Sequence, residues 1–208
     1  MVQPEPSYPV QFSVGYPERP LSRLTTLLRL ITGIPIAIIV ILVNGGFHVG
    51  AYYAGTGLVG GSVILAPLLM ILFRQKYPRW WFDWNVALLK FGNRVLAYFL
   101  LLQNEYPSTD EEQTVHLDVP YPDVPRDLNR WLPLVKWLLA FPHYIVLGFL
   151  SVALLVVVII AWFAILFIGR YPIALFNFAV GTIRWFNRVN AYAILLVTDC
   201  YPPFRLGP

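Results

Sequence analysis

Two groups of cationic and tyrosine residues, spaced alike, are the clearest candidates for chemistry in this sequence. In each group a cation pair lies one helical turn apart and precedes an Ala-Tyr dipeptide, and the second group follows the first by 94 residues. The six residues are Lys90, Arg94 and Tyr98 in the first group and Arg184, Arg188 and Tyr192 in the second. Such cations could bind lipid headgroups or phosphates, or contact a partner protein. The alternative is structural: Arg94 and Arg188 could instead hold an acid such as Asp83, or linker carbonyl groups.

Catalytic and metal-binding patterns are not found in the sequence. The three histidines, His48, His116 and His143, do not share metal-ligand spacing. No phosphate loop, GxSxG, HExxH or CxxC pattern occurs, and the single Cys200 excludes an internal disulfide. His143 follows Pro142 in an apolar segment, where it could ligate a haem or be a hydrogen-bonded interfacial histidine. We expect no enzymatic activity, no metal and no cofactor.

The composition is that of a membrane protein. Of the 208 residues, 58% are hydrophobic and 12% are charged, whereas about 25% are charged in an average soluble domain. No charged residue occurs between Arg29 and Arg74, or between Lys136 and Arg170. Uncharged apolar runs of this length indicate membrane segments. Because the basic residues flank these runs, we do not expect nucleic-acid binding.

The apolar runs predict one helical hairpin in each half of the chain. Thirteen extra residues in the first half fit best in the Gly-rich stretch Asn44–Gly61, so we expect a turn there and at the corresponding place in the second half. The predicted hairpins are Leu21–Val43 with Leu58–Phe73, and Leu128–Gly148 with Ser151–Gly169. We favour hairpins that cross the membrane completely, and the alternative is a pair of re-entrant hairpins.

Other segments surround each predicted hairpin. Alternating apolar residues precede each one, at residues 8–16 and 115–121, and predict either extended lead-ins or a paired two-stranded sheet. An aromatic, cationic helix follows each hairpin and is expected to lie in the membrane interface; a third crossing is the alternative. The dipeptide Tyr-Pro occurs seven times, always at an expected boundary, because proline keeps the residue before it extended.

The distribution of basic residues predicts the topology. All fifteen Lys and Arg residues lie outside the two predicted hairpin tips. The positive-inside rule then places both termini, the linker 103–127 and both amphipathic helices in the cytoplasm.

Three sequence stretches carry a family resemblance. They are RWLPLVKWLLAFPHYIVL (130–147), FAILFIGRYP (163–172) and RVNAYAILLVTDCYPPF (188–204). Together they resemble a bacterial membrane family catalogued as domain of unknown function 4389, and the resemblance extends over nearly the whole chain. It implies a membrane location and a bacterial origin, and no activity is established for the family.

We therefore expect an all-α integral membrane protein of the bacterial cytoplasmic membrane, built from two tandem repeats, residues 1–107 and 108–208. Each repeat would comprise a strand lead-in, a transmembrane hairpin and an amphipathic interfacial helix. The leading functional hypothesis is a structural or accessory subunit of a larger membrane complex, with lipids and other membrane subunits as partners. The alternative is a lipid- or isoprenoid-binding or transport protein. Its cleft would be lined by Phe141, Trp162 and Phe163 and ringed by Arg94 and Arg188.

Overall fold

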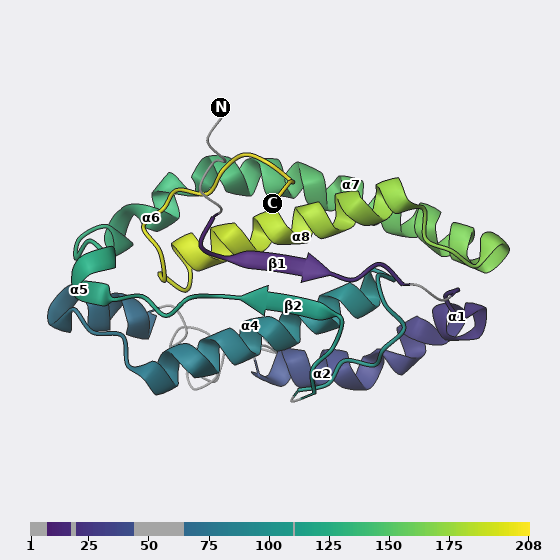
Figure 1. The fold of residues 1–208 in the computed structure, drawn as a ribbon, viewed down its shortest axis with the longest axis horizontal. Coiled ribbons are helices and arrows are strands. Elements are labelled where there is room, and N and C mark those ends of the chain that lie inside the picture. Colours follow the sequence, from purple (N-terminus) through teal and green to yellow (C-terminus); the bar gives the residue numbers. More distant parts are fainter. Residues whose placement is uncertain (1–7, 18–19, 44–64, 110) are drawn as a thin grey trace, which may run out of the picture.

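The computed structural model describes residues 8–17, 20–43, 65–109 and 111–208 (Figure 1). Helices make up most of it, together with one small sheet, so the expected mostly helical fold is confirmed. The elements in chain order are β1 (Gln11–Val14), α1 (Arg23–Thr32), α2 (Ile34–Val43), η1 (Met70–Arg74), α4 (Arg79–Phe99), β2 (Val115–Asp118), α5 (Val124–Asp127), α6 (Pro133–Leu139), α7 (Phe141–Ile168) and α8 (Ile173–Ala193). The π-helix η1 ends a longer apolar helix, Leu65–Arg74.

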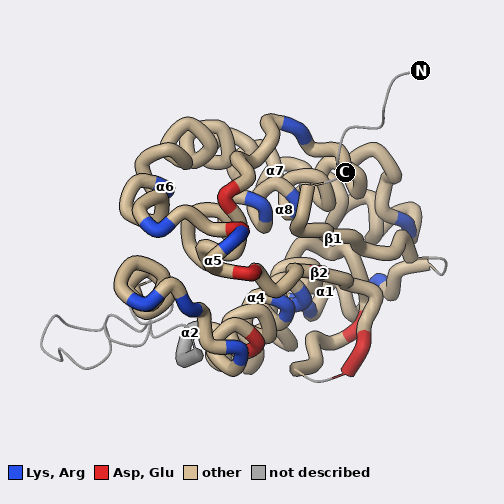
Figure 2. Tube along the Cα trace, turned by 60° about the vertical axis from the view of Figure 1, so that its left-hand side comes forward, with Lys and Arg blue, Asp and Glu red and all other residues tan. Residues whose placement is uncertain are grey.

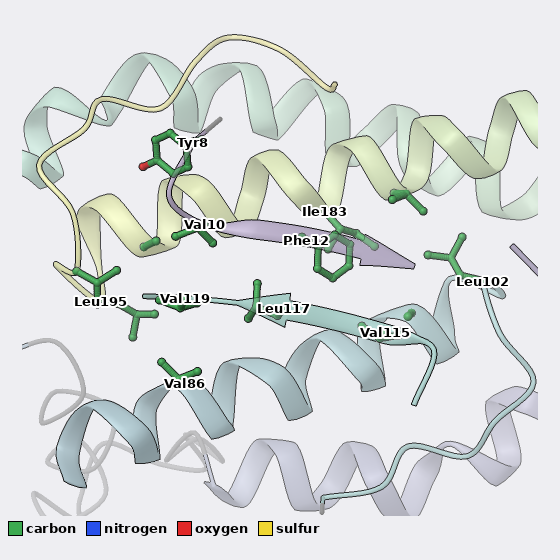
Figure 3. Close-up of a cluster of buried hydrophobic side chains, with 14 of the residues drawn as sticks. Tyr8, Val10, Phe12, Val86, Leu102, Val115, Leu117, Val119, Ile183 and Leu195 are labelled. Atoms are coloured by element: carbon green, nitrogen blue, oxygen red, sulfur yellow. The ribbon is translucent and has the colours of Figure 1, made fainter. Parts of the chain in front are cut away.

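The two lead-in segments pair with each other as a sheet. β1 and β2 are antiparallel, and Phe12 lies opposite Leu117. Both of these side chains are buried, whereas the neighbouring pair Ser13 and His116 is exposed. Figure 3 shows the buried side chains of the two strands between the surrounding helices. Of the two possibilities left open by the alternating pattern, the paired sheet is correct.

Two long helices flank this sheet. α4 packs against β2 and α8 packs against β1 (Figure 1). Both helices contain 21 residues, and their first and last residues are each 94 positions apart. Each begins after the proline of a Tyr-Pro dipeptide, Pro78 or Pro172, whose φ angles are −56° and −60°. These prolines favour a helix start because their ring fixes φ and they have no amide hydrogen to leave unpaired.

Each lead-in is hydrogen-bonded to the residue two positions before the long helix of the other half. The Tyr16 hydroxyl donates to the Tyr171 carbonyl at 2.6 Å. In the corresponding contact, the Tyr121 hydroxyl donates to the Tyr77 carbonyl. Buried residues from both halves form one cluster around the sheet. The two halves therefore share one hydrophobic core.

The outer helices break at corresponding positions in both halves. Gly33 separates α1 from α2, which are bent by 45°, and Ala140 separates α6 from α7. In each case a proline, Pro35 or Pro142, lies two residues beyond the break. A helix running through this point would lose the hydrogen bond that proline cannot donate, and the proline ring would clash with the preceding turn. Glycine also suits the first break because a Cβ on Gly33 would lie 2.5 Å from the Phe99 ring.

The predicted turn at Gly148–Ser151 is wrong. α7 is one continuous helix of 28 residues, so Leu128–Gly148 and Ser151–Gly169 do not form a hairpin. A lone glycine costs a helix only about 1 kcal/mol, so Gly148 does not by itself force a turn. The chain reverses instead after Gly169, which ends α7 at φ 77°, and α8 returns along α7. The other predicted tip, Asn44–Gly61, lies outside the described residues.

α7 is the one helix in the described ranges that is by itself long and apolar enough to cross a membrane. At about 1.5 Å per residue it extends about 42 Å, against a hydrocarbon core of about 30 Å. It carries no Asp, Glu, Lys or Arg, and the charged positions in Figure 2 lie on other elements. The bent pair α1–α2 meets the same criterion when counted as one span. Length and composition thus permit at least one membrane span in this part of the protein.

Candidate functional site

The first predicted cation pair lies at a polar pocket between β2 and α4. The pocket has a volume of about 340 Å³ and brings Lys90 and Arg94 together with the exposed face of the sheet. Its other polar side chains are Gln11, Ser13, Glu112, Gln113, His116 and Asp118. The two cations therefore share the pocket with two carboxylates, Glu112 and Asp118, and the pocket is not a purely cationic site.

The hydrogen-bonding groups of Lys90 and Arg94 are only partly paired within the described chain. One guanidinium nitrogen of Arg94, Nη1, donates to the Ser108 carbonyl at 2.8 Å, while its buried Nε has no partner among the described residues. Lys90 is exposed, and its ammonium group forms no hydrogen bond or ion pair within the described chain. Asp83 pairs with Arg79 at 3.3 Å and not with Arg94. Arg94 thus binds a linker carbonyl, as in the structural alternative, and leaves hydrogen-bonding capacity in the pocket.

The second cation pair holds the C-terminal segment. Arg184 donates to the Phe12 carbonyl at 3.0 Å and to the Leu206 carbonyl at 2.9 Å. Arg188 donates to the carbonyls of Arg205 and Gly207, at 3.3 and 2.9 Å. Burial lowers the pKa of both arginines, and for Arg188 the neighbouring Arg184 and Arg205 lower it further. These two cations therefore bind main-chain carbonyl groups of the protein itself.

Tyr98 and Tyr192 each lie beneath a buried cation from an outer helix. The Arg29 guanidinium lies 4.4 Å from the centre of the Tyr98 ring, and the Lys136 ammonium lies 5.2 Å from that of Tyr192. Arg29 and Lys136 were not among the site residues predicted from the sequence. The signal was available, because both lie six residues before a proline, Pro35 or Pro142.

The two buried cations, Arg29 and Lys136, both donate hydrogen bonds to main-chain carbonyl groups. Arg29 donates to the carbonyls of Tyr98 and Gln103 at 2.9 and 2.8 Å. Lys136 donates to the Thr198 carbonyl at 2.8 Å and forms an ion pair with Asp199 at 2.7 Å. Burial lowers the pKa of Lys136, and the pairing with Asp199 opposes this effect. These contacts tie each outer helix to the end of α4 or to the segment that follows α4 or α8.

An apolar cleft lies between α1 and α7, that is, between the two halves. Its volume is about 330 Å³, and its polar lining is limited to Thr26, Arg29 and Trp162, which donates from Nε1 to the Thr26 carbonyl at 3.3 Å. The apolar lining consists of Leu30, Phe99, Leu101, Leu155, Val158 and Ile159. Trp162 was predicted to line such a cleft. The cleft described here does not include the other predicted lining residues, Phe141 and Phe163, and Arg29 takes the place predicted for Arg94 and Arg188.

Residues 131–205, which include α6, α7 and α8, match the family model described as "Domain of unknown function (DUF4389)". This part of the chain belongs to that family. No curated protein and no solved structure matches the chain. The DUF4389 segment contains Lys136, His143 and the second cation pair, whereas Lys90, Arg94 and Tyr98 precede it.

His143 lies inside the DUF4389 segment and is fully buried. Its Nδ1 accepts a hydrogen bond from the Trp185 indole at 3.1 Å, and its ring stacks on Phe204 at 4.0 Å between centroids. No group of three or more His, Cys, Asp or Glu residues in the described ranges could hold a metal ion. The contacts of His143 match the hydrogen-bonded histidine that the sequence left open. His116 lies at the polar pocket, and His48 is outside the described residues.

Proposed function

We propose that this protein is a membrane lipid- or isoprenoid-binding protein that holds one hydrocarbon chain in the cleft between α1 and α7. The carrying observation is an apolar cleft of about 330 Å³ whose walls come from both halves of the chain. Binding sites for small molecules have volumes of about 300–1,000 Å³ and are mostly apolar with a few polar groups. This cleft has that character, and its size fits a single chain.

The surroundings of the cleft favour a ligand that arrives from a membrane. Leu30 on α1 is 76% exposed and Leu155 on α7 is 63% exposed, although both line the cleft. Large contiguous apolar surfaces mark contact with a membrane or another protein. A chain leaving the bilayer could enter the cleft without crossing water.

The polar groups of the cleft provide a place for a headgroup. Arg29 is 2% exposed, lines the cleft, and has a buried Nε without a partner among the described residues. An oxygen of a phosphate or carbonyl group near this nitrogen would accept its hydrogen bond. Arg29 thereby takes the headgroup role that sequence analysis assigned to Arg94 and Arg188.

The proposal includes an origin by duplication. The equal bounds of α4 and α8 support it, as do the paired Tyr16–Tyr171 and Tyr121–Tyr77 contacts. It also includes insertion in a bacterial cytoplasmic membrane. The Tyr8 hydroxyl donates to the Cys200 carbonyl at 3.1 Å, so the two ends of the described chain lie on one side, which we place in the cytoplasm.

Native mass spectrometry of the detergent-purified protein tests lipid binding. Val158 lines the cleft, whereas Val156 on the same helix is 51% exposed and does not. Val158→Phe should fill the cleft and remove the retained lipid, and Val156→Phe, the matched control, should keep it. Arg94→Ala combined with Arg188→Ala should also keep it. Equal retention by the two phenylalanine variants would reject the cleft as the binding site.

An accessory subunit is the second candidate function. Trp131, just before α6, is 66% exposed, and Trp137, within α6, is 60% exposed. Tryptophan is enriched at protein interfaces. Purification in mild detergent should then recover a stoichiometric partner, and Trp131→Ala with Trp137→Ala should release it. A protein that purifies alone and retains lipid would leave lipid binding as the function.

A further inference from the structure

The C-terminal segment is hydrogen-bonded to α8. Three consecutive carbonyl groups, those of Arg205, Leu206 and Gly207, accept hydrogen bonds from Arg184 and Arg188. The Leu206 side chain packs against Gly181, where an added Cβ would lie 2.8 Å from the Leu206 Cβ. A peptide segment whose carbonyl groups face the two arginines, with one aliphatic side chain against Gly181, therefore fits this surface.

The corresponding surface of α4 lacks most of these contacts. Lys90 and Arg94 stand 94 residues before Arg184 and Arg188. Arg94 holds one carbonyl, that of Ser108, much as Arg188 holds that of Arg205. Lys90 holds none, although Arg184 in its place bridges the Phe12 and Leu206 carbonyls. The space beside Lys90 and Leu117 is the polar pocket of about 340 Å³.

We propose that this pocket binds a peptide segment of a partner protein. Carbonyl groups of the peptide accept hydrogen bonds from Lys90 and from Arg94, whose Nε is buried and unpartnered in the described structure. Glu112 and Asp118, which also line the pocket, accept from its amide groups or from a basic side chain. A peptide presents both acceptors and donors, whereas an isolated anion would face these two carboxylates. The inference does not depend on lipid binding in the α1–α7 cleft.

The test uses a fluorescent peptide with the sequence of residues 202–208 and the full-length protein in mild detergent. The protein's own C-terminal segment is present at an effective concentration of the order of millimolar, so it keeps the α8 surface occupied. Micromolar peptide then reports on the α4 pocket by fluorescence anisotropy. Lys90→Glu should weaken binding at least tenfold. Arg79→Glu, which reverses an exposed charge on the same helix outside the pocket, should not change it.

Two results of the anisotropy experiment would overturn the proposal. The first is that the peptide does not bind the unmodified protein detectably, and the second is that it binds the unmodified protein and Lys90→Glu with equal affinity. A third contrary result is Lys90-dependent binding of inorganic phosphate or of anionic vesicles without peptide binding. That result would assign the pocket to an anionic group. Circular dichroism of Lys90→Glu serves as the folding control, and the exposed position of Lys90 favours an unchanged spectrum.

Discussion

The side-chain amides of Asn93 and Asn187, 94 residues apart, bond to each other reciprocally. Each Nδ2 donates to the other Oδ1 at 2.8 Å, and both side chains are buried. Each amide also donates to a carbonyl one turn earlier on its own helix, that of Leu89 or Ile183. This contact joins α4 and α8 within the core. The two asparagines occupy equivalent positions of α4 and α8, so the contact joins the two halves of the chain through matching residues.

The free energy of unfolding lost on replacing one asparagine should exceed half of the loss on replacing both. Asn93→Leu leaves the buried Asn187 amide without its partner, which costs about 1–3 kcal/mol. Asn187→Leu should behave alike, and in the double variant neither unpaired amide remains. Chemical unfolding of the three variants measures the coupling free energy. Additive losses would show that the two amides do not act as a pair.

Lys136 should make the free energy of unfolding depend on pH in the alkaline range. Burial lowers its pKa in the folded protein below the unfolded value of 10.5. The unfolded chain therefore keeps the proton to higher pH, and the free energy of unfolding rises with pH between the two values. Asp199, Tyr192 and Cys200 also act on this ammonium group.

The matched variant is Lys136→Arg, because Arg29 occupies the corresponding site in the first half. Arginine stays protonated throughout this range, and titration of the neighbouring groups is common to both proteins. The difference between their unfolding free energies is followed from about pH 8 to the unfolded pKa. Its change with pH gives the contribution of Lys136 titration alone. A difference that does not change with pH contradicts the expected shift.

The continuity of α7 can be tested at Gly148. A Cβ there would meet nothing within 4 Å, so Gly148→Ala should stabilise the helix by about 0.5–1 kcal/mol. Ser151→Pro should destabilise it by about 3 kcal/mol. Thermal unfolding of both variants gives the two values. A turn at Gly148–Ser151 would produce the opposite pattern, since proline is favourable in turns.

His143 and Trp185 should behave as a matched pair. Their counterparts in the first half, Ile36 and Phe91, form an apolar contact in another cluster. His143→Ile leaves the buried Trp185 Nε1 without an acceptor and should cost about 1–3 kcal/mol. Adding Trp185→Phe removes that donor and should recover part of the loss in unfolding experiments. No recovery would mean that packing against Phe204 dominates at this position.

Much of the inner architecture was predictable from sequence. The 94-residue correspondence and the Tyr-Pro dipeptides placed α4 and α8, since proline marks a helix start by local geometry alone. Alternating apolar residues also marked both strand segments as extended. Pairing of β1 with β2 could not be decided from the sequence, because it depends on contacts between segments about a hundred residues apart.

The outer helices were harder to predict. The turn at Gly148 was inferred from a length difference between the halves, and nothing in the local sequence forces a turn there. The roles of the repeated cations also depended on tertiary structure. Arg184 and Arg188 meet the C-terminal segment, whereas Lys90 and Arg94 meet a pocket, although the local sequences are alike. Arg29 was visible as a repeated cation, but its burial beside an apolar cleft was not.

The most direct test of lipid binding in the α1–α7 cleft is photo-crosslinking with a phospholipid that carries a diazirine at the end of one acyl chain. Mass spectrometry would map the cross-linked residues in the protein and in Val158→Phe. The account predicts enrichment at Leu30, Val158 and Trp162, which line the cleft, and loss of that enrichment in Val158→Phe. Cross-links spread evenly over the exposed outer face of α7, with no enrichment in the cleft and no effect of Val158→Phe, would contradict it.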